Sequence, residues 1–392
     1  MEILPVLDPL DKPKERLWYS LIPRGSAPGV SVGHTCTFTP CGEGGKGRIL
    51  IVGGANPSGS FSHSQIINLD NHEWDIPDWE GLEARYEHCS FVPESCPQSL
   101  WVFGGAQQNG NRSCIQNIQL KDSGSHWKDV SVKGKPPCPR TYHTNSACLG
   151  DRLYVFFGGE AGAEPVSDQK LHVFDAVSST WSQPETQGRC PPARHGHIIV
   201  AVGSKIYIHG GMAGDKFHSD MYCLDTGKPE HCQKISVSQL PCIYFNSYLD
   251  ASKIVYLEKI RVCPLFKGTM KWETVRAKGD IPPGVAAHSV VVLGKNIYIF
   301  GGMTADGASN SMYKFNTDKG RWVLMKFEGD MPPNRLDHSM CLLPWKVCDE
   351  RNGDEGRADS PAGSETIHLA FVFGGMDTHG VIHNDCIVTV VT

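Results

Sequence analysis

The chain has 392 residues, of which 40% are hydrophobic and 20% are charged, so it can bury a sizeable core and is not a largely disordered polymer. Its 42 acidic and 37 basic residues give a net charge of −5, which argues against a nucleic-acid partner. The longest apolar runs have only four or five residues, whereas a membrane-spanning helix needs about twenty. The N-terminus lacks a basic stretch followed by an apolar one, so we expect no signal peptide, and we expect the 15 scattered cysteines to be reduced thiols of a cytoplasmic protein.

Three marks recur six times in the same order along the chain. A tryptophan comes first, and a histidine follows it 14 to 16 residues later. A short apolar run that ends in a glycine pair completes each unit. The tryptophans are Trp18, Trp74, Trp127, Trp181, Trp272 and Trp322; the histidines are His34, His88, His143, His197, His288 and His338; and the glycine pairs begin at Gly53, Gly104, Gly158, Gly210, Gly301 and Gly374.

The spacing of these units predicts the fold. Most successive histidines stand about 50 residues apart, which is the period of a kelch repeat, in which one repeat forms one four-stranded blade. The last glycine pair is followed by a further strand but by no tryptophan, whereas Trp18 has no strands of its own before it. The sequence therefore predicts an all-β fold, a six-bladed kelch β-propeller closed by strands from both termini, with the segment around Trp18 to Ile22 as the outer strand of the last blade.

Each mark has an expected structural role. The glycine pair is predicted to end the second strand, where the chain needs unusual backbone angles. The tryptophan is predicted to open the outer strand and to wedge its ring between blades. The histidine is predicted to hydrogen-bond from the inner strand into the next blade, which would make neighbouring blades cooperative.

The organisation of the chain follows from this repeat. Residues 1–17 form an N-terminal extension and residues 18–392 form the propeller. About 40 residues, roughly 226–268, are inserted between the third and fourth strands of blade four, either as a peripheral flap or as a poorly folded insertion. The polar, acidic stretch at about 346–366 in blade six is predicted to be a disordered loop.

Four arginines are the first candidates for binding a partner. They stand three residues before the histidine in four repeats, at Arg85, Arg140, Arg194 and Arg335. Because the turns into the inner strands converge on one mouth of the ring, the four guanidinium groups could form a basic cup that grips an acidic partner segment. The alternative is that each arginine pairs with a neighbouring blade and only holds the ring together.

The loops that follow the glycine pairs are predicted to open on the same mouth. Loops on a rigid scaffold often carry binding residues. The candidates that we select for partner binding, beside the arginines, are Asn56, Arg112, Asp215, Lys216, Asp306 and Asp377. Further polar or aromatic loop residues are Asn109, Glu160, Phe217 and His379.

Many stretches outside the repeat marks are similar to a known family. They include LPVLDP near the start, IVGGANP from Ile51, LHVFDA from Leu171, RHGH from Arg194 and RLDHSMC from Arg335. On these stretches the whole chain resembles the family of kelch-repeat Rab effectors, although the insertion in blade four departs from the family pattern. The resemblance implies binding of a GTP-bound late-endosomal Rab GTPase and help in docking vesicles from late endosomes at the trans-Golgi network. It also implies a link to an endosomal phosphoinositide kinase, with the protein cytoplasmic and held on endosome and trans-Golgi membranes only through its partners.

Other functions find less support in the sequence. The six framework histidines belong one to each blade, so we expect them to be structural and expect no metal site and no cofactor. We can assemble no catalytic set, so we expect no enzyme; a small-molecule enzyme remains an alternative. The main alternative is a substrate receptor of a ubiquitin ligase, but the propeller leaves only 17 residues to dock a ligase.

Overall fold

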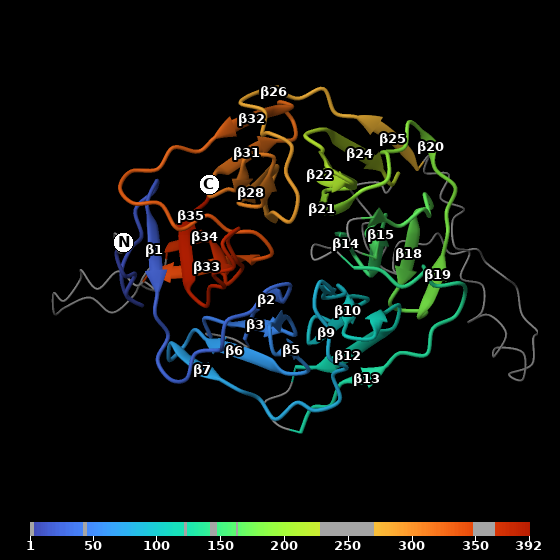
Figure 1. The fold of residues 1–392 in the computed structure, drawn as a ribbon. Helices are drawn as coiled ribbons and strands as arrows, with labels where there is room; N and C mark the ends of the chain where they lie inside the picture. Colours follow the sequence, from blue (N-terminus) through green and yellow to red (C-terminus); the bar gives the residue numbers. More distant parts are fainter. Residues whose placement is uncertain are drawn as a thin grey trace, which may run out of the picture.

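A computed structural model of the chain shows a ring of six sheets around a central axis (Figure 1). It describes residues 4–41, 45–120, 124–141, 147–161, 164–227, 270–347 and 365–392. Within these ranges all regular structure is β-strand, which confirms the predicted all-β, six-bladed propeller. No helix long and apolar enough to span a membrane occurs among the same residues.

Each blade is an antiparallel sheet of four strands, numbered outward from the axis. Blade one consists of β2 (Thr35–Thr39), β3 (Arg48–Val52), β6 (Ser64–Asn68) and β7 (Glu73–Asp75). Blade two consists of β8 (Cys89–Phe91), β9 (Ser99–Phe103), β12 (Ile115–Gln119) and β13 (Lys128–Asp129). Blade three consists of β14 (Ala147–Leu149), β15 (Arg152–Val155), β18 (His172–Asp175) and β19 (Thr180–Ser182).

The second half of the ring has the same plan. Blade four consists of β21 (His195–Val202), β22 (Lys205–Ala213), β24 (Met221–Asp225) and β25 (Lys271–Thr274). Blade five consists of β27 (Ser289–Leu293), β28 (Asn296–Phe300), β31 (Met312–Asn316) and β32 (Arg321–Leu324). Blade six consists of β33 (Ser339–Val347), β34 (Glu365–Phe373), β35 (Cys386–Val390) and β1 (Trp18–Leu21).

The ring is closed by both ends of the chain. The N-terminal strand β1 pairs antiparallel with the C-terminal strand β35, with Trp18 opposite Thr389 and Leu21 opposite Cys386. The predicted closure is therefore confirmed. The N-terminal extension also belongs to this blade, because Leu7 N donates to Ser20 O at 2.9 Å and Ser20 N donates to Pro5 O at 2.8 Å.

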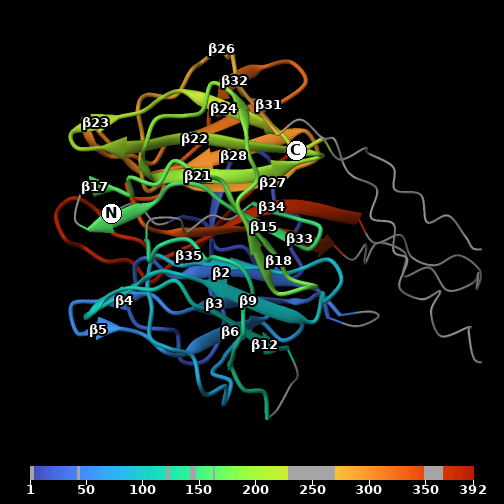
Figure 2. The same cartoon turned by 90° about the vertical axis from the view of Figure 1, so that its right-hand side faces the viewer.

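Small hairpins follow the glycine pairs and project from one side of the propeller, where Figure 2 shows β4, β5, β17 and β23. The hairpin strands are β4 (Ala55–Asn56) with β5 (Gly59–Ser60), β10 (Ala106–Gln107) with β11 (Gly110–Asn111), β16 (Gly159–Ala161) with β17 (Glu164–Pro165), the end of β22 with β23 (Lys216–Phe217), and β29 (Met303–Thr304) with β30 (Gly307–Ala308). In five blades both glycines of the pair have left-handed backbone angles, such as φ of 62° at Gly53 and 97° at Gly54. Non-glycine residues rarely adopt these angles, which explains the preference for glycine at this point. In blade three the two angles belong to Phe157, with φ of 57°, and Gly158, with φ of 121°.

A short parallel segment also covers the outer edge of the blades, a feature that we did not predict. In blade four this is β20 (Gln187–Gly188) beside β25, and in blade five it is β26 (Lys278–Gly279) beside β32. The glycine of this segment has a positive φ in every blade: Gly25, Gly81, Gly134, Gly188, Gly279 and Gly329. A Cβ on Gly279 would lie 2.2 Å from the carbonyl oxygen of Trp322, so the close backbone approach requires glycine.

The apolar core lies between neighbouring blades rather than at the axis. One cluster joins Ile198 and Val200 of blade four to Ile297 and Phe315 of blade five. The repeated tryptophans enter these layers as predicted. The Trp322 ring of blade five, for example, lies 5.0 Å from the His209 ring of blade four.

Two stretches interrupt the regular spacing of the strands, one in blade four and one in blade six. Asp225 at the end of β24 pairs with Lys271 at the start of β25, so the insertion joins two adjacent strands of blade four. Residues 228–269 lie outside the described part of the chain, and their order stays a prediction. In blade six, β33 extends to Val347 and β34 begins at Glu365, so residues 346, 347, 365 and 366 lie in strands and the predicted loop is shorter at both ends. Residues 348–364 between them also lie outside the described ranges.

Candidate functional site

The four candidate arginines are completely buried. The relative exposure of Arg85, Arg140, Arg194 and Arg335 is 0%. Because no guanidinium group reaches the solvent, the predicted basic cup does not exist, and these side chains are not available to an acidic partner. The alternative, that the arginines hold the propeller together, fits their contacts.

Arg335 shows how such an arginine works. Its Nη1 donates to the Gly374 carbonyl oxygen at 2.9 Å and to Asp385 Oδ1 at 2.8 Å, and its Nη2 donates to Asp385 Oδ2 at 2.9 Å. Gly374 follows the second strand and Asp385 precedes the third, so the guanidinium bridges strands of its own blade. Burial by itself would raise the pKa of the Asp385 carboxyl, but the hydrogen bonds and the positive charge of Arg335, together with the nearby His383, outweigh this effect and lower the pKa below its ordinary value.

Two further blades repeat this arrangement. Arg194 pairs with Asp220, at 2.7 Å from Nη1 to Oδ1, and Arg140 Nη2 lies 3.3 Å from Asp168 Oδ2. The main chain of these arginines reaches the preceding blade instead, because the Arg335 carbonyl oxygen accepts from Gly302 N of blade five at 2.8 Å. The arginine side chain therefore fixes its own blade, whereas its backbone fixes the blade junction. The aspartate directly before the third strand, Asp220 or Asp385, was the sequence signal for this role.

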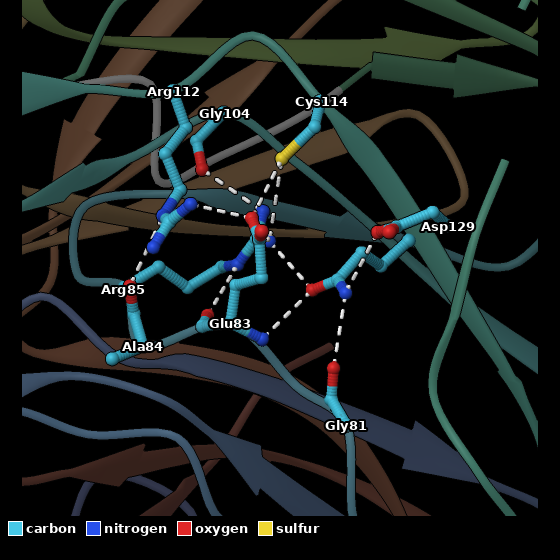
Figure 3. Close-up of polar contacts among 9 residues, drawn as sticks. Gly81, Glu83, Ala84, Arg85, Gly104, Arg112, Cys114 and Asp129 are labelled. Carbon is cyan, nitrogen blue, oxygen red and sulfur yellow. Dashed lines mark hydrogen bonds and ion pairs between the residues drawn. The ribbon is translucent and has the colours of Figure 1, made fainter. Parts of the chain in front are cut away.

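In blade two the buried arginine, Arg85, is paired by different residues (Figure 3). Cys114 stands directly before the third strand, where blades four and six have aspartate. Arg85 Nη2 donates to Gln116 Oε1 at 2.6 Å and to Cys114 Sγ at 3.5 Å. The Glu83 carboxylate lies 3.6 Å from Arg85 and accepts a hydrogen bond from Arg112. The side chain of Arg112, another candidate for partner binding, is thus committed to an ion pair within its own blade.

The remaining candidates lie together on the face formed by the small hairpins. Asp215 and Lys216 are exposed at the tip of the blade-four hairpin, and Asp306 is exposed at the tip of the blade-five hairpin. Asn56 in blade one and Asp377 in blade six are half-buried and accept backbone hydrogen bonds of their own turns. The structure therefore gathers the loop candidates on one face, as predicted. Whether they bind a partner stays a prediction.

The charge on this face is opposite to the one that we predicted. The described hairpins carry four carboxylates, from Glu160, Glu164, Asp215 and Asp306, and the equivalent turn of blade six adds Asp377. Against them stand Lys216 and Lys170, which lies in the loop after the blade-three hairpin, while Arg112 forms an ion pair with Glu83. A hairpin face with this balance favours a basic partner surface rather than an acidic one.

The five framework histidines that the structure describes are structural, and they bond to the preceding blade rather than to the following one. His34 Nε2 of blade one lies 3.1 Å from the Phe373 carbonyl oxygen of blade six, and His338 Nε2 lies 2.6 Å from Ser289 Oγ of blade five. Burial lowers the pKa of His34 to about 4, so this ring is neutral at pH 7. His143 lies outside the described ranges. No group of three or more metal-ligating side chains occurs in the part of the chain that the structure describes.

One further histidine departs from the repeat. His209 directly precedes the glycine pair of blade four, where blades two, three, five and six have phenylalanine. It is fully buried, and its Nδ1 lies 3.3 Å from Nε2 of His288 in blade five. Burial lowers the pKa of His209 to about 3. An alignment of the six repeats against one another would have shown that this residue departs from the pattern.

The geometry and the comparisons with known proteins agree on the class of protein to which the chain belongs. The fold and its repeated framework define a kelch-repeat β-propeller, and the family described as the KLHDC2/KLHL20/DRC7 Kelch-repeats domain matches residues 33–244 and 260–348. A zebrafish protein named "Rab9 effector protein with kelch motifs" is 58% identical over 401 residues and covers 100% of both chains. The human and mouse proteins of the same name are each 44% identical over 414 residues; the human match covers 100% of both chains, and the mouse match covers 100% of this chain and 98% of its own. The chain belongs to this family of Rab9 effector proteins with kelch motifs.

Proposed function

We propose that the protein is a non-enzymatic effector that binds the GTP-bound form of a late-endosomal Rab GTPase of the Rab9 type. The observation that carries this proposal is the full-length similarity to relatives named as Rab9 effectors. The fold supports it in a general way, because a rigid propeller with exposed hairpins is a binding scaffold rather than a catalytic site. The proposed role is to promote docking of vesicles from late endosomes at the trans-Golgi network.

We further propose that the Rab binds on the hairpin face. This face combines exposed tips with an excess of carboxylates, so it would recognise a basic patch on the GTPase. Membrane association would be peripheral and would depend on the Rab and on an endosomal phosphoinositide kinase. In this proposal the protein is cytoplasmic when it is not recruited.

A nucleotide-dependent capture assay tests the function. Rab9 is immobilised with GDP or with a non-hydrolysable GTP analogue, and binding of the purified chain is measured. We expect capture only by the GTP-analogue form. Equal capture by both forms, or none, would contradict the effector role. Recovery of a cullin or an elongin from cytosol would instead support the ubiquitin-ligase receptor.

Charge reversal tests the surface separately. The variant Asp215→Lys/Asp306→Lys changes two exposed hairpin tips and should weaken binding about tenfold, most strongly at low salt. The matched control, Glu94→Lys/Asp318→Lys, reverses two exposed carboxylates in turns at the opposite ends of the strands and should bind normally. If both variants bind like the original chain, the Rab does not use the hairpin face, but the effector role itself stands.

A further inference from the structure

The junction between blades six and one contains a pair of thiols in contact. Cys36 lies on β2, the inner strand of blade one, and Cys341 lies on β33, the inner strand of blade six. Their Sγ atoms are 3.2 Å apart, although the residues are 305 positions apart in the sequence. Cys341 is buried and Cys36 is partly exposed. A disulfide needs an S–S distance of about 2.0 Å, so a shift of roughly 1.2 Å would join them.

This junction is also where the two ends of the propeller meet. Blade six is completed by the N-terminal strand β1, and the chain then runs on to β2 of blade one. The connection between these two blades thus depends on the pairing of β1 with β35. A covalent link between β2 and β33 would hold blades six and one together independently of β1.

We propose that Cys36 and Cys341 form a disulfide under oxidising conditions and so lock the closure of the ring. With hydrogen peroxide as the oxidant, the two thiols lose two protons and two electrons, one S–S bond replaces two S–H bonds, and the peroxide is reduced to two molecules of water. Cys36 is the more exposed of the two residues, so in this proposal it is the thiol that the peroxide oxidises to a sulfenic acid, and Cys341 resolves the sulfenic acid with loss of water. The disulfide closes a loop between two residues that are 305 positions apart in the 392-residue chain, which restricts the unfolded state.

The surroundings of the pair set the conditions for the reaction. Burial raises the pKa of the Cys36 thiol well above its ordinary value, and the neighbouring Cys341 raises it further. The thiolate is the reactive form, so oxidation should be slow at neutral pH and faster at higher pH. The pair therefore stays reduced in an ordinary cytosol and responds to sustained oxidation.

Two cysteines on the inner strands of blades two and three provide an internal comparison. Cys89 and Cys148 lie on the inner strands of blades two and three, β8 and β14. The Cys148 Sγ contacts the Gly150 carbonyl oxygen at 3.4 Å and the Val92 carbonyl oxygen at 3.9 Å. Because this sulfur is directed at carbonyl oxygens, we expect no crosslink between Cys89 and Cys148.

The test is oxidation of the full chain with hydrogen peroxide, followed by peptide mass spectrometry without reduction. We expect a crosslinked peptide pair containing Cys36 and Cys341, two hydrogens lighter than the separate peptides, together with a rise of several degrees in the melting temperature. Both changes should be absent in Cys36→Ser and reversed by dithiothreitol.

Cys386→Ser is the matched control, because Cys386 belongs to the same buried cluster but is not in the proposed bond. It should still form the crosslink. Oxidation that leaves Cys36 and Cys341 unlinked while the exposed Cys41 and Cys96 react would overturn the proposal. A crosslink between Cys341 and Cys386 in place of the expected one would overturn it as well.

Discussion

Replacing the buried Arg335 by methionine is the most direct test of the role that the structure gives to the repeated arginines. Methionine has a similar length but no hydrogen-bond donors, so the variant removes the bonds to Asp385 and to the Gly374 carbonyl oxygen without leaving a large cavity. Removing one partner of a buried ion pair costs about 3–5 kcal/mol. The Asp385 side chain is 39% exposed and can regain water, so we expect a loss at the lower end, about 3 kcal/mol.

Equilibrium unfolding in urea measures this change, with circular dichroism as the probe of the sheets. The companion variant is Asp385→Asn, which replaces one of the two accepting oxygens by an amide N–H group and leaves the buried Arg335 guanidinium without its counter-charge, so it should also cost about 3 kcal/mol. Binding of Rab9 to the folded Arg335→Met variant should be normal, because the side chain does not reach the surface. A loss of less than about 1 kcal/mol for Arg335→Met, or loss of binding without loss of stability, would refute a structural role for this arginine.

Three further predictions follow from the packing. His209 is neutral in the folded state because burial lowers its pKa to about 3. Between about pH 3 and the ordinary pKa of 6.5, the unfolded chain therefore binds more protons than the folded chain. The free energy of unfolding falls as the pH falls through this window. His209→Phe should therefore reduce the acid-side slope of unfolding free energy by about 1.4 kcal/mol per pH unit, and an unchanged slope in urea titrations at pH 4–6 would contradict the lowered pKa. Trp322→Ala should cost about 3–5 kcal/mol in the same assay, because the ring is 1% exposed between blades four and five, and a loss below about 1 kcal/mol would place the ring at the surface. Deleting residues 1–22 should cause aggregation or a large loss of melting temperature, because it exposes the edge of β35; a truncated chain that melts like the full one would contradict the closure by β1.

The repeat marks predicted the fold correctly because each has a local physical cause. A glycine pair reports a backbone conformation that other residues rarely adopt, and Gly53 and Gly54 have that conformation in the structure. A tryptophan at a fixed spacing reports a large ring that must be buried, and Trp322 is buried between two blades. The closure by Trp18 to Leu21 followed from counting which repeat lacked an outer strand.

The candidate site was predicted less well, because burial and charge pairing depend on contacts between distant positions. Arg335 is followed fifty residues later by its partner Asp385, and only the folded blade brings the two together. The sequence pattern placed the four arginines at one position of the repeat but could not say that the position is buried. The wrong sign that we predicted for the charge of the hairpin face followed from this error. Because the arginines are buried, carboxylates such as Asp215 and Asp306 dominate the charge of that face.

The sequence by itself determined the number of blades, the positions of the glycine turns and the loops that follow them, since all of these repeat with the period of the chain. It also determined the closure by both termini, because one repeat lacks its outer strand. The tertiary structure alone decided which polar side chains face the solvent and which are neutralised inside a blade. It also decided which thiols touch, because Cys36 and Cys341 meet only when the first and last blades of the ring come together. The physical reason is that a periodic pattern reports local backbone and burial requirements, whereas pairing between residues hundreds of positions apart depends on the closed ring.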